Sequence, residues 1–204
     1  MTDQNPTEQF RLFVAVPIPD PVRDKMRAVQ LELHSLAPHS AVRWTKSEQF
    51  HLTLRFLGDV PSRRVEDLRE SVRAACAGAP ALSLRARGVG FFPNARSPRV
   101  VWVGINDGKD YLADLQRKIE SVVQPFTEES SGEHFAGHVT LGRFKHVNRF
   151  RINELKAYVE AMKDRVFGEW TAREIEIIRS ELSATGPRYT PLATLRLGME
   201  IAPP

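Results

Sequence analysis

The chain has 204 residues, of which 42% are hydrophobic, a composition typical of a globular protein with a sizeable core. Lys and Arg number 29 against 25 Asp and Glu, and this net charge of +4 permits an anionic substrate without requiring nucleic acid. No apolar run reaches membrane-spanning length and no signal peptide opens the chain, so we expect a cytoplasmic protein that does not contact a membrane. The single cysteine, Cys76, cannot form an internal disulfide and is expected in the core.

The first half of the chain reads as strand, helix, strand, helix, strand. A strand over 11–16 is followed by a helix that begins with Asp20 as N-cap and Pro21 in its first turn. A strand over 50–58, a second helix and a strand near 81–89 complete this half. The apolar residues that predict the two helices recur every three or four positions: Val22, Met26, Val29, Leu33 and Leu36, then Val65, Leu68, Val72 and Cys76.

The second half repeats this order. A strand over 99–105 precedes a helix, a strand around 138–144, a further helix and a strand near 172–180. The helices are predicted from Leu112, Leu115, Ile119 and Val122, then Ile152, Leu155, Val159 and Met162. We interpret this as a diverged duplication within one domain over 1–204, with repeats at about 11–90 and 99–185 and a final strand at about 190–201.

One short motif occurs at the same place in both repeats. His51-Leu52-Thr53-Leu54 and His138-Val139-Thr140-Leu141 alternate polar and apolar residues, as half-buried strands do. Each histidine and its threonine should share one face while the apolar residues enter the core. A single His-x-Thr pattern arises by chance, but its duplication favours a functional site. Two imidazoles can act as base and acid near neutral pH.

These segments resemble the two-histidine (2H) phosphoesterases. The resemblance runs from about Arg11 to Leu197, and its most specific part is the sequence HLTLRFLG at 51–58. Phe91-Phe92-Pro93 and Arg188-Tyr189 also match, more weakly. The branch most similar to this chain comprises the bacterial and archaeal RNA 2',3'-cyclic phosphodiesterases, also called LigT-like or 2'-5' RNA ligases.

The resemblance implies an α+β fold with two pseudo-symmetric lobes, each an antiparallel β-sheet with outer α-helices, and an active-site cleft between them. It also implies metal-independent hydrolysis of RNA that ends in a 2',3'-cyclic phosphate, leaving a 2'-phosphate. Joining of 2'-5' linkages in tRNA halves is a further activity of the family. By family convention His51 is the proton donor and His138 the proton acceptor. No cofactor is expected, and the protein is expected to be a monomer.

Other side chains are candidates for binding the substrate. Thr53 and Thr140 are suited to hydrogen-bond the non-bridging phosphate oxygens. Arg55 is four positions from His51 and should share its face of the strand. Arg143 is five positions from His138, so it should lie on the opposite face and needs a bulge near Gly142 to reach the site. The aromatic residues considered for stacking on a base are Phe13, Trp44 and Phe92. The connections 37–48 and 125–137 both lead into a histidine strand and are placed to rim a cleft.

Three alternatives remain from the sequence. A related 2H phosphodiesterase acting on small cyclic phosphates or 2'-5' oligonucleotides would carry the same motifs. An RNA-binding module without turnover has no need of paired imidazoles. A metal-dependent hydrolase is disfavoured because the sequence lacks an Asp/Glu/His ligand cluster. His134 and His138 have the four-residue spacing of helical zinc sites, but Gly137 interrupts the segment and no Glu follows His134.

Overall fold

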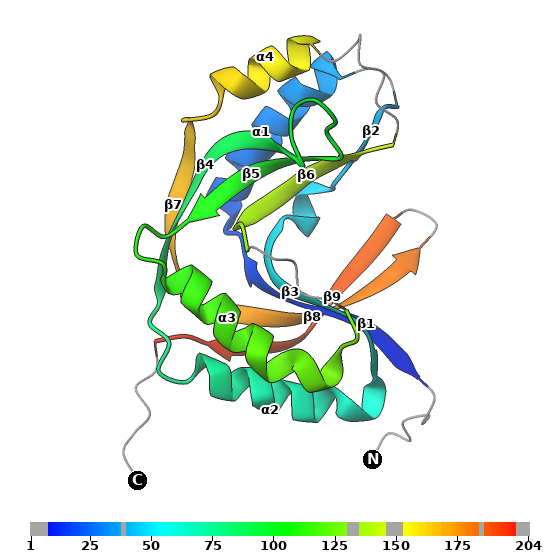
Figure 1. Ribbon diagram of the computed structural model, residues 1–204, viewed down its shortest axis with the longest axis vertical. Coiled ribbons are helices and arrows are strands. Elements are labelled where there is room, and N and C mark those ends of the chain that lie inside the picture. Colours follow the sequence, from blue (N-terminus) through cyan, green and yellow to red (C-terminus); the bar gives the residue numbers. More distant parts are fainter. Residues whose placement is uncertain (1–7, 38–39, 130–134, 146–152, 184–185, 199–204) are drawn as a thin grey trace.

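A computed structural model describes residues 8–37, 40–129, 135–145, 153–183 and 186–198 (Figure 1). In these residues two antiparallel sheets are flanked by α-helices, which confirms the α+β class. The four-stranded sheet has the order β3-β1-β8-β9, and the five-stranded sheet has the order β2-β6-β5-β4-β7. No helix in the described part of the chain is long and apolar enough to cross a membrane.

The elements follow the predicted order, with an additional short strand at Val42–Trp44 inside the connection over 37–48. Their bounds are β1 Gln9–Pro17, α1 Asp20–Leu36, β2 Val42–Trp44, η1 Ser47–Gln49, β3 His51–Pro61, η2 Ser62–Arg64, α2 Val65–Cys76, β4 Leu82–Phe92, β5 Val100–Asn106, α3 Tyr111–Val123, η3 Gln124–Phe126, β6 His138–Phe144, α4 Asn153–Ala161, β7 Val166–Ala172, β8 Glu174–Ser183 and β9 Gly186–Arg196.

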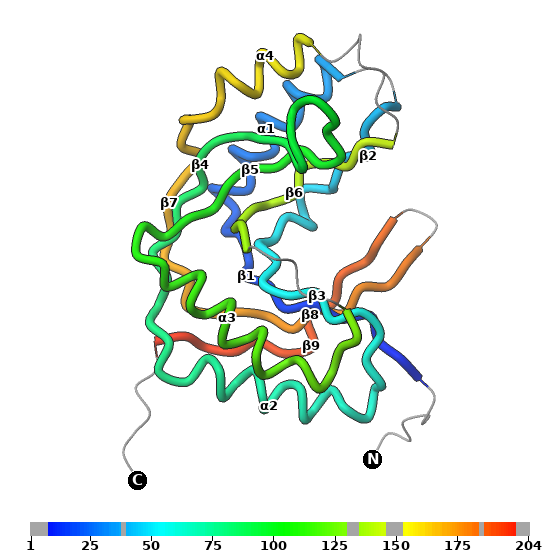
Figure 2. Tube along the Cα trace, viewed as in Figure 1, coloured from blue at the N-terminus to red at the C-terminus, as the bar shows by residue number. Residues whose placement is uncertain are grey.

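The two sheets exchange strands between the halves of the chain. β4 leaves the first half and pairs with β5 and β7, whereas β8 returns from the second half to pair with β1. Figure 2 traces both crossings, from α2 through β4 into the five-stranded sheet and from β7 through β8 into the four-stranded sheet. α2 and α3 contact each other beside the four-stranded sheet, and α1 contacts α4 and β7 at the other end. Each sheet with its helices therefore draws on both halves of the chain.

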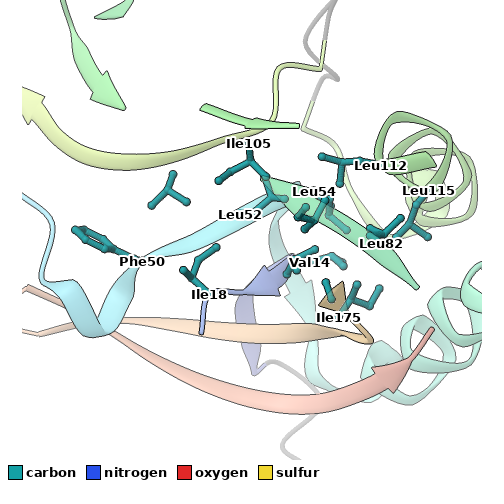
Figure 3. Packing of buried hydrophobic residues seen from close by; sticks show 14 of the residues in the cluster. Val14, Ile18, Phe50, Leu52, Leu54, Leu82, Ile105, Leu112, Leu115 and Ile175 are labelled. Carbon is teal, nitrogen blue, oxygen red and sulfur yellow. The ribbon is translucent and has the colours of Figure 1, made fainter. Parts of the chain in front are cut away.

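A continuous apolar core lies between these layers and fixes the faces of the histidine strands. Leu52 is fully buried and Leu54 is 3% exposed, and both pack in the same cluster as Ile105 of β5 and Leu112 of α3 (Figure 3). In β6, Val139 and Leu141 are fully buried as well. The alternation in the two motifs thus sends the leucines and valine inward, as predicted, and leaves the histidines and threonines on the opposite faces, partly exposed.

Some boundaries differ from the prediction. The carbonyl of Pro19 accepts the amides of Val22 and Arg23 at 3.0 and 2.9 Å, so α1 begins one residue early and Asp20 lies in its first turn. The region around 172 contains two strands, β7 and β8, that meet at Arg173. β9 starts at Gly186 and ends at Arg196, and residues 199–201 of the predicted strand lie outside the described residues, as does Ile152 of the last predicted helix.

Candidate active site

The two histidine motifs meet at one cavity between the sheets. The cavity measures about 90 Å³, with β3 on one side and β6 on the other. Both histidines and both threonines of the motifs line it, so the structure brings these four predicted residues together. The full lining consists of Thr45, Gln49, His51, Thr53, Phe56, His138, Thr140, Arg143 and Tyr189.

A β-bulge follows the His-x-Thr motif in each strand. In β6 the pairing with β5 steps from Thr140 to Gly142, and in β3 the pairing with β1 steps from Thr53 to Arg55. A bulge of one residue inverts the facing of the residues that follow it, as far as the next bulge. Arg143 thereby joins the face of His138, as its predicted bulge requires, and Phe56 takes the corresponding position five residues after His51.

The same bulge removes Arg55 from the cavity, so its prediction as a phosphate ligand was wrong. Arg55 is 7% exposed, and its Nε lies 2.9 Å from Oε2 of Glu120 on α3. Its guanidinium also donates a hydrogen bond to the carbonyl of Glu129. Simple alternation placed Arg55 beside His51, but the bulge turns it inward, where it ties β3 to α3.

Each histidine is oriented in the same way by its own chain. Nδ1 of His51 lies 2.7 Å from the carbonyl oxygen of Gln49, and Nδ1 of His138 lies 2.7 Å from that of Ala136. A carbonyl oxygen only accepts hydrogen bonds, so Nδ1 must carry the proton in both rings. Nε2 is then the nitrogen that gains or loses a proton, which is the requirement for a general acid or base.

Burial lowers the pKa of both imidazoles in the free protein, which favours their neutral forms. It lowers the pKa of His51 to about 4, an effect opposed by the Gln49 carbonyl and reinforced by the positive charges of His138 and Arg143. Burial also lowers the pKa of His138, opposed by the Ala136 carbonyl and reinforced by Arg143. Both shifts arise from the cost of placing positive charge in a partly dry site that already holds an arginine. A bound anion would offset that cost.

Aromatic rings surround both histidines. The ring centroid of Phe13 lies 4.7 Å from that of His51, and Tyr189 meets the same imidazole edge-on at 5.3 Å. Phe92 meets His138 edge-on at 4.9 Å. Phe13 is only 2% exposed and packs against the His51 ring. It therefore has no free face on which a base could stack, contrary to the prediction. Phe92 is partly exposed beside His138.

Trp44 lies next to this cavity rather than in it. A side chain at Gly142 would place its Cβ 2.9 Å from Cε3 of Trp44, so the glycine makes room for the indole against β6. The indole centroid also lies 5.8 Å from the ring of His34 on α1. Trp44 packs against the core and lines a neighbouring cavity. The site lining does not include it.

Four lining residues were not predicted as site residues. Gln49 precedes His51 by two positions, and Thr45 lies in the connection that was expected to rim the cleft. Phe56 reaches the site only through the bulge. Tyr189 had one signal, its place in the Arg188-Tyr189 pair, but nothing local in the sequence connects β9 to His51. In the second connection, residues 125–129 line a different cavity beside Gly58, and residues 130–134 lie outside the described residues.

Comparisons with known proteins agree with this fold. Residues 16–102 match the family model described as LigT like Phosphoesterase. An RNA 2',3'-cyclic phosphodiesterase of Methanothermobacter thermautotrophicus is 33% identical over 192 residues, which cover 93% of this chain and 100% of the relative. One from Archaeoglobus fulgidus is 32% identical over 185 residues, with 90% and 98% covered. The crystal structure of TT0787 from Thermus thermophilus superposes with a TM-score of 0.73 at 28% identity, covering 94% of this chain and 100% of that one.

The opposed His-x-Thr strands have the arrangement expected for a two-histidine phosphoesterase. With relatives more than 30% identical over almost their whole length, the chain belongs to the LigT-like phosphoesterase family.

Proposed function

We propose that this protein is an RNA 2',3'-cyclic phosphodiesterase that opens the cyclic phosphate at an RNA end and leaves a 2'-phosphate. The observation that supports this most directly is the cavity lined by His51, Thr53, His138 and Thr140 from two facing strands. The curated relatives from Methanothermobacter and Archaeoglobus carry that activity in their names.

The reaction requires proton transfer on opposite sides of the phosphorus. His138 removes a proton from the attacking water, and His51 protonates the departing 3'-oxygen, following the family assignment. Thr53 and Thr140 donate hydrogen bonds to the non-bridging oxygens, and Arg143 balances the negative charge that accumulates on them. These groups cover the roles that a metal ion would otherwise fill, so we propose catalysis without metal or cofactor.

Substrate binding changes the protonation of the two histidines so that one can act as acid and the other as base. His51 must be protonated to act as an acid, although burial lowers its pKa to about 4 in the free protein. The negative charge of the phosphate raises the pKa of both imidazoles when it enters the cavity. Because the two rings repel each other when both are charged, the first proton bound opposes the second. The pair therefore loads one proton as the phosphate binds.

Several further assignments belong to the same proposal. Phe92 offers a partly exposed ring beside His138 on which a base can stack, and Trp44 lines the adjoining cavity. The substrate in this proposal is RNA, including tRNA fragments, and the location is the cytoplasm.

We propose that the chain forms one bilobal domain over 1–204, because strands from both halves build each sheet. We propose that this domain acts as a monomer. Joining of tRNA halves through a 2'-5' linkage would use the same groups in reverse.

The test is to incubate a short RNA ending in a 2',3'-cyclic phosphate with the protein in excess EDTA. We expect an end that phosphatase converts to a free diol and that carries its phosphate on the 2'-oxygen. A product with a 3'-phosphate would contradict the assignment of the leaving oxygen. Activity that disappears in EDTA and returns with a divalent ion would contradict the two-histidine mechanism.

A further inference from the structure

A second cavity of about 150 Å³ adjoins the catalytic cavity. Four residues line both cavities, namely Thr45, Gln49, Arg143 and Tyr189. The second cavity extends from them toward β2 and the start of β9, and adds Arg43 and Lys46 to the lining. The two cavities therefore meet along these four side chains.

Positive charge is concentrated there, and the described residues that line this cavity include no Asp or Glu. Arg43 pairs directly with Arg143 across β2 and β6, so two like charges face each other on one side of the sheet. Like charges directly opposite each other destabilise a sheet, and an anion between them would relieve the repulsion. Both arginines and Lys46 are exposed, and within the described residues none of the three forms a salt bridge. The arrangement is suited to an anionic ligand.

Three buried or partly buried hydrogen bonds hold the walls of this cavity. Gln30 of α1 is 8% exposed, and its Nε2 donates to the carbonyls of Thr45 and Leu141, each at 2.7 Å. These bonds hold the segment after β2 against β6. On the other side of the cavity, Nε2 of the Gln49 side chain donates to the carbonyl of Pro187 in β9. The cationic side chains thus extend from a rigid backbone, which reduces the entropy lost when a ligand binds.

We propose that Arg43, Lys46 and Arg143 form a basic subsite for the phosphodiester that joins the last two nucleotides of the RNA. The cyclic phosphate would lie between His51 and His138, and the preceding phosphate would lie against Arg43 and Lys46. Arg143 would stand between the two phosphates, because it lines both cavities. This inference rests on the proposed function and specifies its substrate as the end of an RNA chain. A free cyclic mononucleotide lacks the second phosphate and leaves the subsite empty.

The test compares three substrates that share the same terminal nucleotide. They are a nucleoside 2',3'-cyclic monophosphate, a dinucleotide ending in the cyclic phosphate, and the same dinucleotide with an uncharged methylphosphonate linkage. We expect kcat/KM for the charged dinucleotide to exceed that for the other two about tenfold, the effect of one charge-assisted phosphate contact. Added salt should reduce this preference, because it screens the contact.

The variant Arg43→Gln/Lys46→Gln should bring the ratio of charged to uncharged dinucleotide close to one. The control Lys109→Gln/Lys118→Gln removes the same charge from exposed positions at α3 and should keep the wild-type ratio. Arg43→Lys/Lys46→Arg retains the charges and should restore most of the preference, while circular dichroism verifies folding.

The outcomes separate this inference from the function on which it rests. If the wild type hydrolyses all three substrates equally well, the basic subsite is wrong and the phosphodiesterase activity stands. The same holds if the double glutamine variant keeps the tenfold preference. If the wild type hydrolyses none of them, the proposed function itself is wrong.

Discussion

Acid should destabilise this protein through His51. Burial lowers the pKa of His51 in the folded chain to about 4, from the value of 6.5 expected when the chain is unfolded. Between these two values the unfolded chain binds a proton that the folded chain does not. The stabilising contribution is therefore fully present above pH 6.5 and is lost as the pH falls toward 4. The loss amounts to roughly 2 kcal/mol by about pH 5 and approaches about 3 kcal/mol below about pH 4, somewhat reduced by the partial exposure of the ring.

The variant His51→Gln keeps a polar side chain but cannot titrate in this range. The free energy of unfolding would be measured with urea at about pH 8 and about pH 5 for the wild type and the variant. The wild type should lose about 2 kcal/mol more than the variant between these two pH values. His34→Gln, at an exposed position of α1, is the control and should keep the wild-type loss. Equal losses in wild type and His51→Gln would refute the argument that burial suppresses the charge of this imidazole.

Three further predictions concern the strands that carry the site. His51→Ala and His138→Ala should each lower kcat by about 10²–10⁴, and the double variant should be far less than multiplicatively worse, as single-turnover kinetics can show. Thr53→Val and Thr140→Val should each cost roughly 10- to 10³-fold in kcat/KM while the bell-shaped pH profile persists; unchanged rates would leave the threonines as ordinary strand residues. Arg55→Met should lower the free energy of unfolding by about 2 kcal/mol, since it leaves the partly buried carboxylate of Glu120 on α3 without its ion-pair partner, while the folded fraction retains kcat. A loss of kcat in fully folded Arg55→Met would instead show that Arg55 takes part in substrate binding or catalysis.

The sequence was most predictive where the structure obeys a local period. Alternation in the two motifs correctly separated His51 and His138 from the leucines beneath them, because the strands are half-buried throughout the motif. The prediction from simple alternation failed at Arg55. There a bulge, which no local residue signals, turns the following side chains to the other face of the strand. The need for a bulge before Arg143 was visible only because a function had been assigned to that arginine.

Long-range pairing was harder to foresee. Tyr189 reaches His51 because β9 lies beside β8 and β8 lies beside β1, and this order of strands is decided by how the two halves pack. The same packing covers Phe13, whose place in the sequence equally suited an exposed ring. The spacing of residues along the chain does not reveal either contact. The residues around the histidines were therefore less predictable from the sequence than the two strands that carry them.

The exchange of β4 and β8 has a consequence for how the protein must fold. β1 finds its neighbour β8 only after most of the chain has been added, since Leu12 pairs with Arg179. The first half alone would leave β1 with one open edge and β4 without the sheet in which it belongs. Neither half can therefore close its own sheet, and two separately made halves should become ordered only on meeting each other. A protein of this design commits to its final structure late in synthesis, when the last strands become available, and folds slowly for its size because so many of its contacts join distant residues.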